Sequence, residues 1–136
     1  MSAIETCKIF LVDDDVKTLI TFRGALERKL DFPIEVSIFA YGENCLERMT
    51  EEKPDIVVLD FYLNAIQEKA QTGIEILKQA KELSPQSKII MISGQEDMET
   101  ALECIRNGAY DYIIKNERAL QHLELSINKI RHEQGK

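Results

Sequence analysis

The run Ile56-Val57-Val58-Leu59 constrains the fold more than any other stretch of the chain. Four consecutive large aliphatic residues without polar alternation are typical of a strand buried on both faces, as in a parallel sheet. Asp60 follows directly, at the point where such a strand leaves the core and meets solvent. In open α/β sheets, ligands bind at the carboxyl ends of the strands. Asp60 therefore marks the edge of the sheet where a functional site is expected.

Apolar runs and helical periodicities alternate along the whole chain. Strands are predicted over residues 7–12, 34–39, 56–59, 88–92 and 110–114. Helices are predicted over residues 16 to about 30, 45–49, 73–83, 96–106 and 117 to about 131, with Asp15 as the N-cap of the first. This alternation implies a parallel sheet with helices on both faces. Five such units favour a flavodoxin-like (βα)5 three-layer sandwich with strand order 2-1-3-4-5, and the alternating residues 34–39 suit its edge.

Size and composition describe one ordinary domain over residues 1–136, with 132–136 as a polar tail. The net charge of −7 argues against a surface that binds nucleic acid. No apolar run is long enough to cross a membrane. Cys7, Cys45 and Cys104 are widely spaced and are expected to be buried thiols, which suits the cytoplasm. His122 and His132 are expected on the exposed side of the last helix, without a catalytic role.

The predicted strand order brings polar residues from four strand ends to one edge: Asp13 and Asp14, Asp60, Ser93, and Lys115. Three crowded carboxylates repel one another unless a cation is present. Ligands that are all oxygen suit Mg²⁺, which usually shares a phosphate. A hydroxyl and an ammonium can hold a phosphoryl group, and a carboxylate can be the nucleophile that accepts it. The set is therefore suited to phosphoryl transfer.

Four short motifs contain these residues: Leu11-Val12-Asp13-Asp14, Val58-Leu59-Asp60, Met91-Ile92-Ser93, and Asn107-Gly108-Ala109-Tyr110-Asp111-Tyr112-Ile113-Ile114-Lys115. In this order, the motifs resemble those of the receiver domain of two-component response regulators, such as the chemotaxis receivers. Each motif alone has little specificity, but the four together are highly specific. The resemblance covers nearly the whole chain.

The resemblance implies a role for each site residue. Asp60 would accept a phosphoryl group from the phosphohistidine of a sensor histidine kinase or a histidine phosphotransfer protein. Lys115 would pair with the acyl phosphate, and Ser93 would hydrogen-bond to it. Mg²⁺ would be held by the side chains of Asp14 and Asp60, by Asp13 directly or through water, and by the backbone carbonyl of Tyr62. The domain would assist its own phosphotransfer and dephosphorylation, but it would not be an enzyme.

The resemblance also implies a conformational switch. Tyr112 would turn inward as Ser93 moves toward the phosphate, which would shift the population between two states. The face made by the fourth helix, the fifth strand and the fifth helix would change with it. Partner proteins or a second copy of the chain usually dock on this face. Neither nucleic acid nor a membrane is expected as a direct partner of the domain.

Three positions depart from the family pattern. Asn116 stands where the family usually has a proline joined by a cis bond, so the loop after Lys115 is expected to differ or to retain strain. The polar segment 61–72 is several residues longer than usual and is expected to lie beside the site as a mobile flap. Gly94 replaces a common alanine and makes its loop more flexible. No departure removes a group that the chemistry requires.

Parts of the pattern also fit other functions. Singly, the acids at 13–15 fit a solvated helix start, and Ser93 and Lys115 fit a turn and a surface position. A hydrolase of the haloacid-dehalogenase type would use Asp13 and Asp15 as nucleophile and acid. That family needs a further acidic pair after the lysine, and Asp60 would have no role in it. A degenerate receiver that acts only as a docking module is the third alternative.

Overall fold

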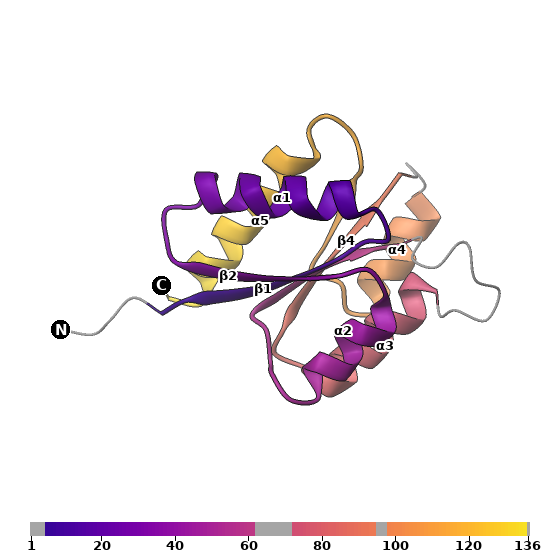
Figure 1. Cartoon of the computed structure of the whole chain (residues 1–136). Helices are drawn as coiled ribbons and strands as arrows, with labels where there is room; N and C mark the ends of the chain where they lie inside the picture. The colour runs from indigo at the N-terminus through magenta and orange to yellow at the C-terminus, as the bar shows by residue number, and fades with distance from the viewer. Residues whose placement is uncertain (1–4, 62–71, 95–97, 136) are drawn as a thin grey trace.

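The computed structural model describes residues 5–61, 72–94 and 98–135. These residues form one parallel sheet with the strand order β2-β1-β3-β4-β5, as predicted. Its strands are β1 (Cys7–Val12), β2 (Ile34–Phe39), β3 (Ile56–Asp60), β4 (Lys88–Ser93) and β5 (Asp111–Ile114). The helices are α1 (Val16–Lys29), α2 (Gly42–Met49), α3 (Gly73–Leu83), α4 (Met98–Arg106) and α5 (Ala119–Glu133). Helices α1 and α5 cover one face, and α2, α3 and α4 cover the other (Figure 1).

Strand β3 shows why the central strands are apolar throughout. Val57 and Leu59 pack into the core under α2 and α3, whereas Ile56 and Val58 pack into the core under α1 and α5. All four side chains are buried. Strand β4 divides its apolar residues between the two cores in the same way. Strand β2, at the edge, keeps most of its side chains half-buried, in agreement with its alternating sequence.

The helix starts follow local capping chemistry. The side chain of Asp15 accepts a hydrogen bond from the backbone N–H of Lys17, which confirms the predicted N-cap of α1. Thr72 caps α3 in the same way by accepting from the N–H of Glu75. Helix α4 ends before Gly108, whose φ of 101° is readily adopted by glycine.

Two predicted helix boundaries need correction. Helix α5 begins at Ala119, two residues later than predicted, because the side chain of Asn116 accepts from the N–H of Arg118 and forms a turn first. It continues to Glu133, whose carboxylate accepts from the hydroxyl of Tyr110. Helix α2 begins at Gly42, three residues before the first apolar residue used to predict it.

Cys7, Cys45 and Cys104 are free and buried, as predicted. Burial raises the pKa of Cys45 to about 12. In the described ranges, no helix combines the length and the apolar character needed to cross a bilayer.

Candidate functional site

Four strands end in polar residues at the same edge of the sheet: Asp13 after β1, Asp60 in β3, Ser93 in β4 and Lys115 after β5. The strand register keeps these ends level, since Val12 pairs with Leu59 and Ser93 pairs with Ile114. Strands β1 and β3 are neighbours, although β2 lies between them in the sequence. This reversal of the winding opens a crevice at the carboxyl edge of the sheet.

An acidic cluster lies in this crevice. Asp13, Asp14 and Asp60 each offer a carboxylate oxygen, and these oxygens all lie within 4.8 Å of one another. Asp13 and Asp60 are only 6% and 7% exposed, whereas Asp14 is exposed. Carboxylates so close together favour a bound cation, and hard oxygen ligands suit Mg²⁺. The three predicted side-chain metal ligands are therefore brought together.

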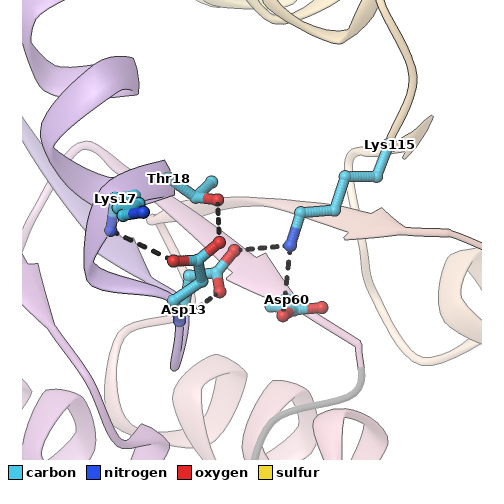
Figure 2. A network of polar contacts seen from close by, with 6 residues as sticks. Asp13, Lys17, Thr18, Asp60 and Lys115 are labelled. Atoms are coloured by element: carbon cyan, nitrogen blue, oxygen red, sulfur yellow. Dashed lines mark hydrogen bonds and ion pairs between the residues drawn. The ribbon is translucent and has the colours of Figure 1, made fainter.

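Lys115 bridges the two buried acids of this cluster (Figure 2). Its Nζ atom lies 2.8 Å from Oδ2 of Asp13 and 3.6 Å from Oδ2 of Asp60. Burial alone would lower the pKa of Lys115, but the hydrogen bond to Asp13 and the charges of Asp60 and Asp13 outweigh it and raise this pKa. The ammonium is thus held charged, where it can neutralise an incoming anion.

The other oxygen of Asp13 is held by the start of α1. Its Oδ1 atom accepts a 2.8 Å hydrogen bond from the backbone N–H of Asp15. The side chain of Asp15 itself accepts from the N–H of Lys17 at 3.1 Å and from the hydroxyl of Thr18 at 2.9 Å. The hydrogen bond from Thr18 is the main cause that lowers the pKa of Asp15. Both oxygens of Asp13 therefore have defined partners, and Asp15 faces its own helix.

Ser93 ends β4 beside Asp60 and is fully buried. Its backbone carbonyl accepts a 2.7 Å hydrogen bond from the N–H of Lys115, which fixes the beginning of the β5–α5 loop. The peptide bond from Lys115 to Asn116 is trans, since the described residues contain no cis peptide bond. Lys115 reaches both carboxylates with this trans bond, so the departure from the family proline leaves the lysine in the site.

The two predicted tyrosines differ in what the structure shows. Tyr112 lies in β5, is half-buried and packs against the core under α2, α3 and α4. Its side chain therefore lies on the face of the sheet that α4 covers. Tyr62, predicted to offer a carbonyl to the metal, lies outside the described residues. So does most of the long segment 61–72, of which the structure describes Phe61 and Thr72.

A contact that the sequence analysis missed fixes the exit of β3. A Cβ atom on Gly73 would lie 2.5 Å from the carbonyl oxygen of Phe61, so no other residue fits there without a shift. The N–H of Phe61 also bonds to the carbonyl of Ile92 at 2.8 Å. The backbone directly after Asp60 is thus held by both α3 and β4. A glycine directly after the Thr72 cap was the signal for this close approach.

Both histidines lie away from the acidic cluster. Nε2 of His122 is 3.1 Å from the carboxylate of Asp111, and the hydroxyl of Ser126 donates to the same carboxylate. This group ties α5 to the beginning of β5. His132 is exposed near the end of α5. Their positions on the outer side of α5 agree with the prediction.

Fold and site together define a three-layer α/β domain with an acidic, lysine-bridged crevice at the carboxyl edge of its sheet. This is the arrangement of domains that accept phosphoryl groups. The family model of the response regulator receiver domain matches residues 9–127, and the chain belongs to this family. Receiver domains are phosphoacceptors and are not generally classed as enzymes.

Several relatives support this membership. The regulatory protein LuxO of Vibrio cholerae is 30% identical over 118 residues, which cover 87% of this chain and 24% of that protein. A CheY-like receiver domain from Methanospirillum hungatei JF-1 superimposes with a TM-score of 0.79 at 25% identity, covering 96% and 98% of the two chains. The BeF3-activated receiver domain of DrrB, a Thermotoga maritima protein, gives 0.79 at 28% identity, covering 94% and 99%. The chain spans about a quarter of the length of the curated relatives it matches.

Proposed function

We propose that Asp60 accepts a phosphoryl group from the phosphohistidine of a sensor histidine kinase or a histidine phosphotransfer protein. Residues 1–136 would act as one receiver domain in this reaction. The observation that carries the proposal is the position of Lys115, whose ammonium lies between the carboxylates of Asp13 and Asp60. Buried thiols suit a reducing compartment, so we place the reaction in the cytoplasm.

In the reaction, an Asp60 carboxylate oxygen forms a bond to phosphorus as the phosphorus–nitrogen bond of the donor breaks. The bonding electron pair goes to the imidazole nitrogen of the donor, which takes up a proton from solvent, and Asp60 becomes an acyl phosphate. Lys115 is placed to leave Asp13 and neutralise the phosphoryl oxygens, since it already lies near Asp60. The hydroxyl of Ser93 would donate a hydrogen bond to one of them. Little covalent chemistry is needed beyond this positioning.

The residues fit Mg²⁺ as the metal. Asp13, Asp14 and Asp60 would hold it through carboxylate oxygens, and the carbonyl of Tyr62 is proposed as a further ligand. Bound Mg²⁺ would offset the charge of the phosphoryl oxygens as they meet a carboxylate. Asp13 and Asp60 are buried and oriented before any ligand arrives, which keeps their reorganisation small.

Intact-mass analysis after incubation with acetyl phosphate and Mg²⁺ tests the proposal. We expect one phosphoryl adduct on the unchanged protein and none on Asp60→Asn. Asp55→Asn is the matched control, because Asp55 lies just before the other end of β3 and its side chain accepts from the N–H of Lys8. An adduct that survives in Asp60→Asn but disappears in Asp13→Asn would support the haloacid-dehalogenase alternative. No adduct on any form would favour the docking module.

We propose that the output face is formed by α4, β5 and α5 and binds a second copy of the chain. Three apolar side chains on the outer side of α4 are exposed: Met98, Leu102 and Ile105. Leu125 of α5 is exposed as well, and α4 buries only Cys104. Glu103 of α4 and Lys129 of α5 are exposed and of opposite charge. In a two-fold dimer, Glu103 of each copy can pair with Lys129 of the other, while the exposed apolar side chains of α4 are covered.

The switch that controls this face would consist of Ser93 and Tyr112. Ser93 lies beside the acceptor, and Tyr112 packs on the side of the sheet that carries α4. Sedimentation velocity with and without acetyl phosphate measures the output, and we expect dimers to increase on phosphorylation. Ile105→Glu should abolish the increase, whereas Ile20→Glu, an equally exposed isoleucine of α1, should not. Monomers under both conditions would contradict the proposed dimer.

A further inference from the structure

We propose that Asp15 is a positioning residue for the metal site, although it contacts neither the metal nor the phosphoryl group. Its side chain fixes the backbone at the start of α1, and its own backbone N–H holds Asp13 in the orientation needed to bind a divalent cation. The inference rests on the proposed function, because it concerns the site in which Asp13 is a ligand. It concerns a different residue, so the two can fail separately.

The contacts at the start of α1 form a short relay. Both carboxylate oxygens of Asp15 are used within its own helix, Oδ1 by the N–H of Lys17 and Oδ2 by the hydroxyl of Thr18. This cap sets the backbone of Asp15 at φ −93° and ψ 103°. The N–H of Asp15 then points at Oδ1 of Asp13 from 2.8 Å (Figure 2 shows the surrounding network). The cap and the ligand are therefore joined by one peptide.

The relay matters because Asp13 is otherwise held by a partner that has to move. Its second oxygen, Oδ2, bonds to Lys115, and in the proposed reaction Lys115 turns to the phosphoryl group. Once Lys115 leaves, the hydrogen bond from the N–H of Asp15 still orients the Asp13 side chain. Groups that hydrogen-bond to a metal ligand and orient it contribute strongly to metal affinity.

The relay also separates the roles of three adjacent acids. By charge alone, residues 13–15 would be equivalent cation ligands. Asp15 has both oxygens occupied in the helix cap, and the cluster that can hold a cation consists of Asp13, Asp14 and Asp60. The cap thus withdraws one acid from the cluster and uses its backbone to orient another.

The test titrates three variants of the full chain with Mn²⁺ alone. Electron paramagnetic resonance of the free ion measures how much Mn²⁺ each variant binds. Asp15→Ala removes the cap and the charge. Asp15→Asn keeps a capping oxygen but removes the charge. Thr50→Ala removes an exposed hydrogen bond from the Thr50 hydroxyl to the carbonyl of Glu47 at the end of α2, which does not belong to the Asp13 relay. Thermal unfolding of each variant is measured without metal.

We expect Asp15→Ala to bind Mn²⁺ on the order of tenfold more weakly, the low end for loss of a partner that orients a ligand. Asp15→Asn should restore most of the affinity, and Thr50→Ala should lower the melting temperature without changing the affinity for Mn²⁺. Equal weakening in Asp15→Asn would show that only the charge matters and would overturn the inference. So would equal weakening in Thr50→Ala, or unchanged binding in Asp15→Ala. If the unchanged protein binds no Mn²⁺, the proposed metal site itself fails.

Discussion

Replacing Lys115 by methionine should strengthen metal binding while it abolishes efficient phosphorylation. In the metal-free site, the ammonium of Lys115 occupies Oδ2 of Asp13 at 2.8 Å, so a metal that takes this oxygen has to displace it. A hydrogen bond between charged groups contributes about 1.5–3 kcal/mol, and the lower end applies because the Lys115 side chain is 32% exposed and screened by solvent. Since about 1.4 kcal/mol is a factor of ten, Mg²⁺ and Mn²⁺ should bind roughly tenfold more tightly to Lys115→Met.

The same substitution has an opposite effect on stability without metal. The buried carboxylates of Asp13 and Asp60 lose their shared cation, so Lys115→Met should unfold about 1–2 kcal/mol more easily in EDTA. At roughly 4 °C per kcal/mol, the melting temperature should fall measurably and should rise more than that of the unchanged protein when Mg²⁺ is added.

Mn²⁺ titration and thermal unfolding with EDTA or Mg²⁺ measure both effects of Lys115→Met. Lys17→Met is the matched control, because Lys17 contributes only its backbone N–H to the network. Its side chain is exposed and forms no ion pair with these acids within the described residues. The control should change metal affinity little. If Lys115→Met binds metal no more tightly than Lys17→Met, the ammonium does not compete for the site and the reasoning is refuted.

Three further predictions concern the same structure. Gly73→Ala should lower the rate of phosphorylation more than it lowers metal-free stability, since the new methyl group must push the Phe61 carbonyl away from its place after the acceptor; equal rates in the variant would contradict this. Burial lowers the pKa of Lys115, but its carboxylate partners raise this pKa by more. The ammonium therefore contributes its full stabilisation at pH values below the ordinary pKa of 10.5, and this stabilisation is lost as the pH rises through the higher pKa of the folded state. The stability difference between the protein and Lys115→Met should therefore stay level through neutral pH and shrink only above this range in alkaline melts. Cys45 and Cys104, whose pKa values burial raises to about 12 and about 11, should resist iodoacetamide at pH 8 until the protein is unfolded, and rapid native labelling would argue against the buried positions.

The sequence predicted the sheet well because its strands carry two kinds of information. The continuous apolar run of β3 reflects burial against both helix layers. The alternating sequence of β2 reflects an edge strand whose Ile34, Val36 and Ile38 are half-buried against one core. Strand ends are therefore well marked, and with the strand order they locate Asp13, Asp60, Ser93 and Lys115 at one edge. Helix starts are less well marked, since the Asn116 turn that delays α5 depends on one side-chain hydrogen bond.

The contacts between individual side chains inside the site could not be predicted from the sequence. Residue types indicated that Lys115 belongs with the acids, but its shorter contact to Asp13 than to Asp60 depends on how the β5–α5 loop leaves Ser93. The bond from the N–H of Asp15 to Asp13 depends likewise on backbone direction, which no pattern of side chains encodes. The glycine at position 73 indicates a close backbone approach, but the sequence does not identify Phe61 as the residue that it approaches.

The contact between Phe61 and Gly73 also favours tolerance of insertions in the connection that follows Asp60. The backbones of Phe61 and Gly73, on either side of residues 62–71 in the sequence, touch, and each doubling of a connecting length costs only about 0.6 kcal/mol in closure entropy. Lengthening this connection therefore adds little strain to the Asp60 end of β3. Protein engineers could graft a recognition peptide or a reporter there and bring it close to a phosphorylation event. Natural relatives could vary the same stretch to change their signalling partners while they keep the chemistry.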